Sequence, residues 1–198
     1  MTAFRRATPD AAEQIARIVC GTAAGIVETL LGDLVKGVEA AALLSAGFIK
    51  GEGVYRTENV LCSMDGEEIT ALLFSYPSRE HRVPALAEAL IPARRLRAVR
   101  PFLEVAVPDS LFVNTFWVAG HLRGAGLGDA LMAAAERRRR ELGLSGINLF
   151  CWNDNDRALR FYARHGFAEK QRIPAGEALG GRHPEGGSLL FRAGGETA

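Results

Sequence analysis

Residues 118 to 128 read Val-Ala-Gly-His-Leu-Arg-Gly-Ala-Gly-Leu-Gly and connect an apolar run to a helical pattern. The run before them, Leu111 to Val118, is rich in Val, Phe and Trp and carries no charge, so it predicts a buried strand. After the glycines, apolar residues recur at helical spacing as far as Leu142, and Gly143 stands where a helix commonly ends. The junction therefore predicts the order strand, glycine loop, helix.

This glycine loop is a candidate site for an anionic ligand. The first amides of a helix lack intrahelical partners, and the helix dipole adds roughly half a positive charge at that end. Gly124, Gly126 and Gly128 let the backbone approach a ligand closely and adopt positive φ. Arg123 adds a guanidinium. A pyrophosphate is the expected ligand.

Spacing excludes two other kinds of glycine loop. A dinucleotide-binding fingerprint needs a third glycine where this chain has Asp129, and a P-loop needs Gly-Lys followed by Ser or Thr, which the sequence lacks. What remains is Arg-x-x-Gly-x-Gly, filled by Arg123, Gly126 and Gly128. A purely structural turn that uses the same glycines stays open as an alternative.

A second helix is predicted from Asn155 to Gly166, after the apolar run Ile147 to Trp152. Asn155 and Tyr162 lie at i and i+7, so they share one helical face, with the small Ala158 between them. Two interpretations are open. Either Asn155 only caps the helix and Tyr162 only packs, or both face a ligand.

Together these segments resemble the GNAT superfamily of N-acetyltransferases, across roughly residues 110 to 172. In such enzymes the glycine loop binds the pyrophosphate of acetyl-CoA, and the strand before it pairs with pantetheine. An Asn and a Tyr on the next helix contact the cofactor and its sulfur. The resemblance implies acetyl-CoA as co-substrate, no metal, and Tyr162 as the catalytic acid. The cofactor-binding residues that it implies are Phe116, Trp117, Val118, Arg123, Gly124, Ala125, Gly126, Leu127, Gly128 and Asn155.

The order of the predicted elements indicates an α+β fold, a GNAT-like, mostly antiparallel mixed sheet flanked by helices. The strands at 111 and 147 are expected to be parallel, joined by a right-handed crossover, and to splay apart at the active site. With 198 residues, 48% of them hydrophobic, the chain fits one domain, residues 1–198. The remaining expected elements are a strand at 4–7, two helices before residue 50, a hairpin around Asp65-Gly66, a strand up to Arg172 and one at 188–192.

An insertion at about 77–101 separates the hairpin from the strand at 111. A helical stretch is expected around Ala85 to Leu90, and arginines outnumber acids in the segment. They suit an acidic substrate, the CoA 3′-phosphate or RNA, but a solvated helix surface is the favoured interpretation. Arg137 to Arg140 are likewise interpreted as cations that complement the dipole at a helix end.

Charge and cysteine content narrow the partners. The formal net charge of +1 gives no general attraction to nucleic acid or to an anionic membrane, so neither is expected. Cys20, Cys62 and Cys151 show no metal-ligand or CxxC spacing and are expected to be reduced thiols of a cytoplasmic protein. The start of the chain has no apolar leader core, and no run is long enough to span a membrane.

The resemblance implies direct attack of an amine on the thioester, but it leaves the general base open. Histone acetyltransferases of this superfamily carry a glutamate on the strand before the glycine loop, where this chain has Phe112. Asn114 lies on the same face and cannot take a proton at neutral pH. An amine that arrives neutral needs no base. The other candidates, acting directly or through water, are Glu104, Glu58, Asp109 and His121.

The predicted function is therefore transfer of an acetyl group from acetyl-CoA to a primary amine of a small molecule or peptide. The first alternative is a regulatory module that binds acetyl-CoA without turnover. The second is a different phosphate-ligand protein that uses the same loop. The identity of the amine is not readable from the sequence, and a homodimer is left open.

Overall fold

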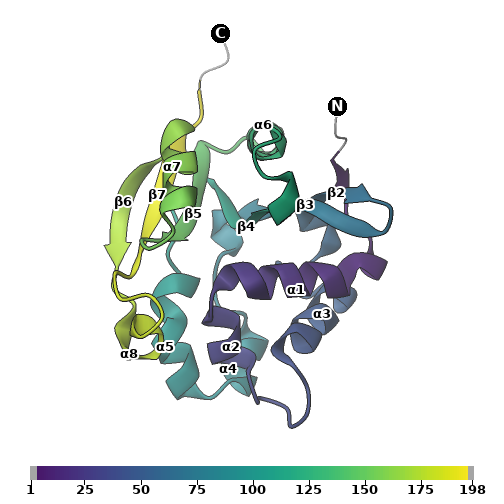
Figure 1. The fold of residues 1–198 in the computed structure, drawn as a ribbon. Coiled ribbons are helices and arrows are strands. Elements are labelled where there is room, and N and C mark those ends of the chain that lie inside the picture. The colour runs from purple at the N-terminus through teal and green to yellow at the C-terminus, as the bar shows by residue number, and fades with distance from the viewer. Residues whose placement is uncertain (1–3, 196–198) are drawn as a thin grey trace. The chain divides into compact units, whose positions relative to one another are not determined.

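The computed structural model describes residues 4–195 (Figure 1). These residues divide into two compact units. Unit 1 comprises residues 4–76 and 114–138, and unit 2 comprises residues 77–113 and 139–195. Strand β4, Leu111–Val118, begins in unit 2 and ends in unit 1, and helix α6, Leu127–Glu141, leads back to unit 2. Both elements have the predicted bounds to within a residue. The glycine loop between them lies entirely in unit 1.

Unit 1 contains an antiparallel ladder of strands β1, Arg5–Arg6, β2, Val60–Asp65, and β3, Glu68–Pro77, whose last residue belongs to unit 2. The predicted hairpin is confirmed, since Asp65 pairs with Glu68 across a turn in which Gly66 has a φ of 59°. The ladder carries the core of this unit on strand β3, which is buried from Ile69 onward.

Three α-helices precede residue 50, where the sequence predicts two. They are α1, Ala12–Ala23, α2, Ile26–Leu31, and α3, Ala40–Lys50. The difference arises at Ala24 and Gly25, which both adopt left-handed backbone conformations and end α1. Two short 3-10 helices, η1 at Pro9–Ala11 and η2 at Thr57–Asn59, complete this part of the unit.

Unit 2 is built on strands β5, Gly146–Trp152, β6, Ala168–Ile173, and β7, Gly187–Ala193. The first residues of β4 pair in parallel with β5, from Leu111 opposite Ile147 to Val113 opposite Leu149. Strand β7 lies antiparallel between β5 and β6. Helix α7, Asp156–Arg164, connects β5 to β6, and the short helix α8, Gly176–Gly180, interrupts the predicted loop before β7.

The strand order is β1-β2-β3-β4-β5-β7-β6, with β4 shared between the units. Every described pairing with a printed register is antiparallel except that of β4 with β5. The predicted fold class, a mixed and mostly antiparallel sheet with helices, is confirmed.

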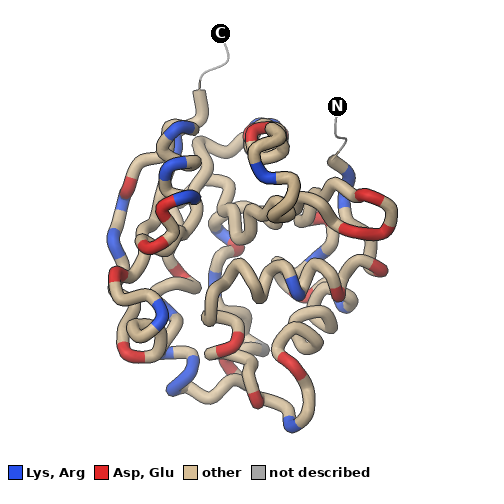
Figure 2. Tube along the Cα trace, viewed as in Figure 1, with Lys and Arg blue, Asp and Glu red and all other residues tan. Residues whose placement is uncertain are grey.

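The arginine-rich insertion forms the short 3-10 helix η3, Ser78–Glu80, and two helices, α4, Ala85–Leu90, and α5, Ala93–Leu103. The predicted helical stretch is therefore α4. Most of its arginines are exposed, but Arg100 donates to Glu88 Oε1 at 2.8 Å and to Glu104 Oε1 at 2.5 Å. Figure 2 shows Lys and Arg interspersed with Asp and Glu along the chain.

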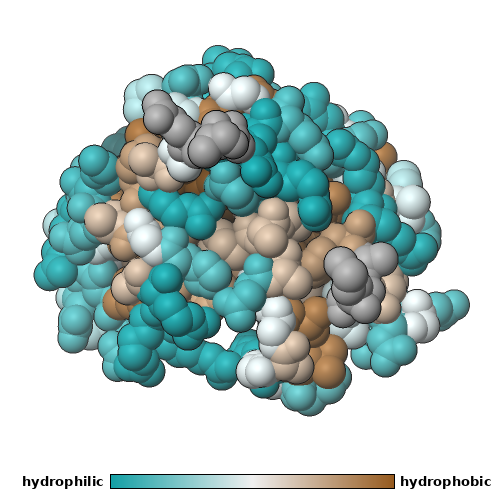
Figure 3. All heavy atoms as spheres, turned by 90° about the horizontal axis from the view of Figure 1, so that it is seen from above, coloured by the Kyte–Doolittle hydropathy of each residue, from teal (hydrophilic) through white to brown (hydrophobic). Residues whose placement is uncertain are grey.

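The surface is mainly hydrophilic on the face drawn in Figure 3, where smaller hydrophobic patches lie among polar residues. Within residues 4–195, no helix combines the length and apolar character needed to cross a membrane.

Candidate functional site

The glycine loop of unit 1 starts from a strand end that is held in place. Ala119, the residue after β4, donates its amide to the Thr70 carbonyl on β3 at 2.9 Å. A single 3-10 turn, η4, Gly120–Leu122, follows. Arg123 then folds back, and its Nε donates to the carbonyl of Val118 at 3.0 Å. This bond fixes the direction in which the chain enters the glycines.

Of the three glycines that the sequence predicts to be free for positive φ, Gly124 and Gly126 adopt it, at 90° and 81°, whereas Gly128 lies within α6. Side chains other than glycine rarely adopt this backbone conformation. A Cβ built on either residue meets no atom within 4 Å, and Gly124, Ala125 and Gly126 are exposed. The glycines therefore serve the backbone conformation and leave open space in front of the main chain.

Helix α6 begins directly at these glycines. The amide of Ala130 donates to the Gly126 carbonyl at 3.0 Å, so the amides from Gly126 to Asp129 precede the first i to i−4 bond of the helix. Those amides and the positive end of the dipole are directed toward the exposed loop. This combination favours a phosphate-bearing ligand.

The last residues of β4 lead directly into the glycine loop. Phe116, Trp117 and Val118 are half-buried, unlike the buried first residues of the strand. An extended backbone of this kind offers alternating N–H and C=O groups to a ligand that carries amides.

In unit 2, Asn155 caps helix α7. Its Oδ1 accepts a hydrogen bond from the amide of Ala158 at 3.2 Å, and its side chain is exposed. The capping interpretation from the sequence is therefore seen directly. The cap uses the carbonyl oxygen, whereas the amide nitrogen of Asn155 is a separate donor group.

Tyr162 is buried on the same helix, with 8% of its surface exposed. Its ring packs edge-on against Phe161 and Phe167, with centroid distances of 5.6 and 5.5 Å. Burial raises the pKa of the Tyr162 phenol well above its ordinary value, and Cys151 adds a smaller contribution. The phenol therefore keeps its proton at neutral pH.

Comparisons with known proteins agree with this geometry. Residues 95–167, from α5 to the end of the turn after α7, match the model of the acetyltransferase (GNAT) family. This segment is therefore similar to the GNAT family. GNAT enzymes are acetyltransferases that use acetyl-CoA and an acceptor substrate.

Solved structures show the same GNAT fold over nearly the whole chain. A protein described as an acetyltransferase has a TM-score of 0.68 at 18% identity, with 98% of this chain and 100% of that chain covered. An N-acetyltransferase from Staphylococcus aureus Mu50 has a TM-score of 0.67 at 18% identity, covering 96% and 100%. Ard1 from Thermoplasma volcanium has a TM-score of 0.59 at 18% identity, covering 98% of each chain. No curated protein sequence matches this chain.

In the GNAT-matching segment, Phe112 occupies the strand position at which the resemblance implies a glutamate base in histone acetyltransferases. The Phe112 ring is buried and stacks on His81, with centroids 3.6 Å apart. Burial lowers the pKa of His81 to about 4, so this histidine is neutral at physiological pH. His81 is a residue that the sequence analysis did not single out.

The other base candidates lie at exposed positions in the GNAT fold. These are Glu58, Glu104, Asp109 and His121. The carboxylate of Glu104 is engaged by Arg100. The main chain of Asp109 has a φ of 53°, and its carbonyl accepts from Ser145 Oγ at 2.7 Å. These contacts give Glu104 and Asp109 roles in the local structure of their own segments.

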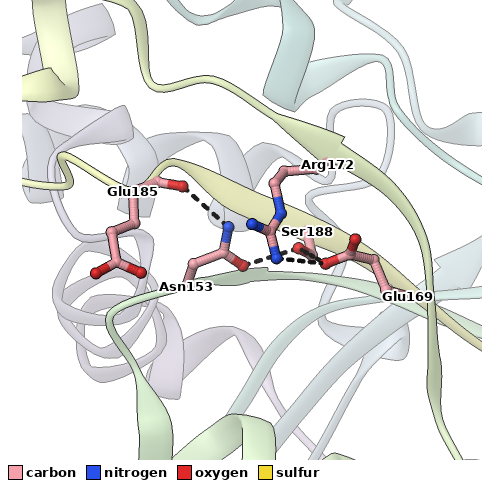
Figure 4. A network of polar contacts seen from close by, with 5 residues as sticks. All are labelled: Asn153, Glu169, Arg172, Glu185 and Ser188. Carbon is pink, nitrogen blue, oxygen red and sulfur yellow. Dashed lines mark hydrogen bonds and ion pairs between the residues drawn. The ribbon is translucent and has the colours of Figure 1, made fainter.

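A polar network that the sequence analysis missed holds the segment between β5 and α7 (Figure 4). Ser188 on β7 is fully buried, and its Oγ lies 2.6 Å from Glu169 Oε2 and 2.8 Å from Asn153 Oδ1. Asn153 Nδ2 donates to the Glu185 carbonyl at 3.0 Å. The Ser188 bond is the main reason why the pKa of Glu169 is lowered. The network fixes the chain two residues before the Asn155 cap.

The neighbouring residue Asp154 binds a histidine. His183 Nδ1 lies 2.7 Å from Asp154 Oδ2, and the His183 ring stacks on Trp152 with centroids 3.9 Å apart. No pattern in the sequence links residues 154 and 183, because only the pairing of β5 with β7 brings them together. In the described residues, no group of three or more His, Cys, Asp or Glu side chains is arranged to hold a metal ion.

Proposed function

We propose that this chain transfers the acetyl group of acetyl-CoA to a primary amine of a small molecule or peptide. The observation that carries the proposal is the loop between β4 and α6, with its two positive-φ glycines and its exposed helix start, inside the GNAT-matching segment. A loop of this geometry suits the pyrophosphate of CoA.

The proposed cofactor contacts come from three segments of the chain. The amides of residues 124–128 bind the pyrophosphate, with Arg123 as an additional positive charge close by. The extended main chain of Phe116, Trp117 and Val118 pairs with the amides of the pantetheine arm. Asn155, at the start of α7, contacts the cofactor.

The proposed reaction is a direct transfer. The lone pair of the amine nitrogen forms a bond to the thioester carbon, and the carbon–sulfur bond breaks, with its electron pair remaining on sulfur. The proton lost by the amine is balanced by the proton gained by the CoA thiolate. Main-chain amides of β4 stabilise the negative charge on the carbonyl oxygen, and Tyr162 donates the proton to sulfur.

The burial of Tyr162 has two opposite effects on its proposed role as proton donor. The raised pKa keeps the phenol protonated, so the donor form is always present. The same shift makes it a weaker acid than free phenol, whereas a thiol has a pKa of roughly 8.5. Positioning of the reactants therefore supplies more of the rate than the proton donor does.

We further propose that residues 1–198 act as one catalytic domain in the cytoplasm, without nucleic acid, membrane or metal as partner. The buried, unpaired thiols of Cys20, Cys62 and Cys151 suit a reducing compartment.

The experiment that tests the function uses one purified sample. Thermal shift with acetyl-CoA, CoA and ATP measures binding, and thiol release is then followed with a panel of amines. Stabilisation by acetyl-CoA together with amine-dependent thiol release supports the transferase. Stabilisation with no thiol release from any amine favours the regulatory module. Stabilisation by ATP alone indicates a different phosphate ligand.

A further inference from the structure

Asn114 breaks the burial pattern of strand β4. Leu111, Phe112, Val113 and Thr115 are buried, whereas Asn114 among them is exposed. The parallel pairing of β4 with β5 runs from Leu111 to Val113, so Asn114 is the first residue of the strand beyond it. The exposed amide of Asn114 therefore stands where β4 is no longer paired with β5 and its main chain is open on that side.

The Asn114 amide is held at both ends by residues of unit 1. Its Nδ2 donates to the hydroxyl of Tyr76 at 3.1 Å, and its Oδ1 accepts from Thr115 Oγ1 at 3.1 Å. Tyr76 is 2% exposed and packs edge-on against Phe74, so its hydroxyl is in a fixed place. An amide oxygen has a second lone pair, which gives Asn114 a preoriented acceptor for an incoming N–H.

Asn114 is on the strand that the proposed function assigns to the pantetheine arm. Side chains alternate along a strand, so Asn114 shares a face with Phe116 and Val118. At about 3.3 Å per residue, Asn114 lies about 13 Å back along β4 from Val118. An arm that starts at a pyrophosphate in the glycine loop and follows β4 backward carries its thioester toward Asn114.

We propose that Asn114, oriented by Tyr76, accepts a hydrogen bond from the attacking amine, and that the acceptors are weakly basic amines such as α-amino groups. This inference rests on the proposed acetyl transfer. An amide oxygen binds the N–H of a neutral amine but can neither remove a proton nor balance the charge of an ammonium group. The remaining residues of β4 carry no charge either.

The fraction of each amine that is neutral at a given pH then determines which amines are preferred as acceptors. An α-amino group has a pKa of roughly 7.8 and a lysine-type amine one of roughly 10.4, so their neutral fractions at pH 7 differ by about 10²-fold or more. In the step itself, the neutral nitrogen forms the bond to carbon with Asn114 Oδ1 holding one of its hydrogens. The excess proton leaves the new amide nitrogen and is balanced by protonation of the CoA sulfur.

The first test measures kcat/KM for a series of primary amines of graded pKa, each over a range of pH. We expect kcat/KM to rise with pH to a midpoint that follows the pKa of the amine used. At pH 7, amines with a pKa near 8 are expected to exceed lysine-type amines by on the order of 10²-fold. A midpoint that is the same for every amine would mean that an enzyme group takes the proton, and would overturn the inference.

The second test compares variants of Asn114 and of Tyr76, which orients it. Asn114→Ala is expected to raise KM for the amine about tenfold and to leave KM for acetyl-CoA unchanged, and Tyr76→Phe is expected to produce part of the same effect. Asn114→Asp adds a carboxylate of the same shape, so it should narrow the difference between weakly and strongly basic amines. Gln171→Ala removes an exposed strand amide elsewhere and serves as the matched control.

The outcomes separate this inference from the function beneath it. No thiol release with any amine refutes the proposed acetyl transfer. Thiol release that depends on amine, with unchanged amine KM in both Asn114→Ala and Tyr76→Phe, refutes only the role of Asn114.

Discussion

Arg138 Nη2 donates a hydrogen bond to Asn59 Oδ1 at 2.9 Å, which joins helix α6 to the short helix η2 across 79 residues of sequence. Arg138 Nη1 also donates to the Glu58 carbonyl at 3.1 Å, and both Arg138 and Asn59 are buried. The sequence analysis interpreted Arg137 to Arg140 as one set of solvated, dipole-complementing cations. The structure divides them, because Arg138 and Arg139 are buried while Arg137 and Arg140 are exposed.

Arg138→Met is expected to lower the free energy of unfolding by about 2 to 3 kcal/mol, because it removes charged hydrogen bonds and leaves the buried Asn59 oxygen without its partner. Arg137→Met, at the exposed neighbour, should change it by less than about 0.5 kcal/mol. Urea unfolding of both variants measures the difference. Equal effects would show that the hydrogen bonds of Arg138 contribute little.

Gly126→Val is expected to abolish acetyl-CoA binding. Its φ of 81° strains any L-residue, and the new side chain would occupy the open space in front of the loop. Thermal shift with acetyl-CoA measures the binding. The matched control is Gly53→Val, since Gly53 also has a positive φ, 57°, and open space around it. Retained binding in Gly126→Val would remove the loop from the cofactor site.

Tyr162→Phe is expected to reduce kcat by about 10²-fold or less and to leave KM for acetyl-CoA nearly unchanged, because only the proton donor is lost. Steady-state thiol release measures both constants. Tyr55→Phe is the control, since burial raises the pKa of that tyrosine too and it belongs to unit 1. An unchanged kcat in Tyr162→Phe would leave Tyr162 with its packing role alone.

Asn155 is tested by separating its cap from its proposed contact. Asn155→Ala should cost about 1 kcal/mol of stability through loss of the bond to the Ala158 amide. Asn155→Asp keeps a capping oxygen but loses the amide donor, so a several-fold higher KM for acetyl-CoA is expected. If Asn155→Asp binds acetyl-CoA as the parent does, the residue is a cap only.

The protein thiols should be slow to react in the folded state. Burial raises the pKa of Cys20 to about 11 and that of Cys151 to about 12. At pH 8 their thiolate fractions lie at least about 10²-fold below that of a free cysteine of pKa roughly 8.5. Since the folded pKa values are raised, the contribution of these thiols to stability is present at neutral pH and is lost as pH rises above about 8.5. Reaction with a thiol reagent, in native and unfolded protein, measures the difference, and equal rates would contradict it.

Much of the fold was predictable because its signals are local. The uncharged run from Leu111 to Val118 gives β4, the Asp65-Gly66 turn gives the hairpin, and Gly143 ends α6. Gly25 suggests a break in the first helix, but the number of helices before residue 50 was wrong, and the left-handed backbone that ends α1 begins one residue earlier, at Ala24.

The sequence by itself determined the glycine loop, since positive φ at Gly124 and Gly126 and the start of α6 follow from residue type and local order. It also determined the GNAT resemblance, which lies within one continuous segment. The tertiary structure decided which residues of similar type are buried and which partners they bind. It buried Arg138 but not Arg137, fixed Asn114 on Tyr76, and brought Asp154 to His183. These outcomes depend on contacts between distant strands and helices, and burial and partner choice are properties of such contacts rather than of any local pattern.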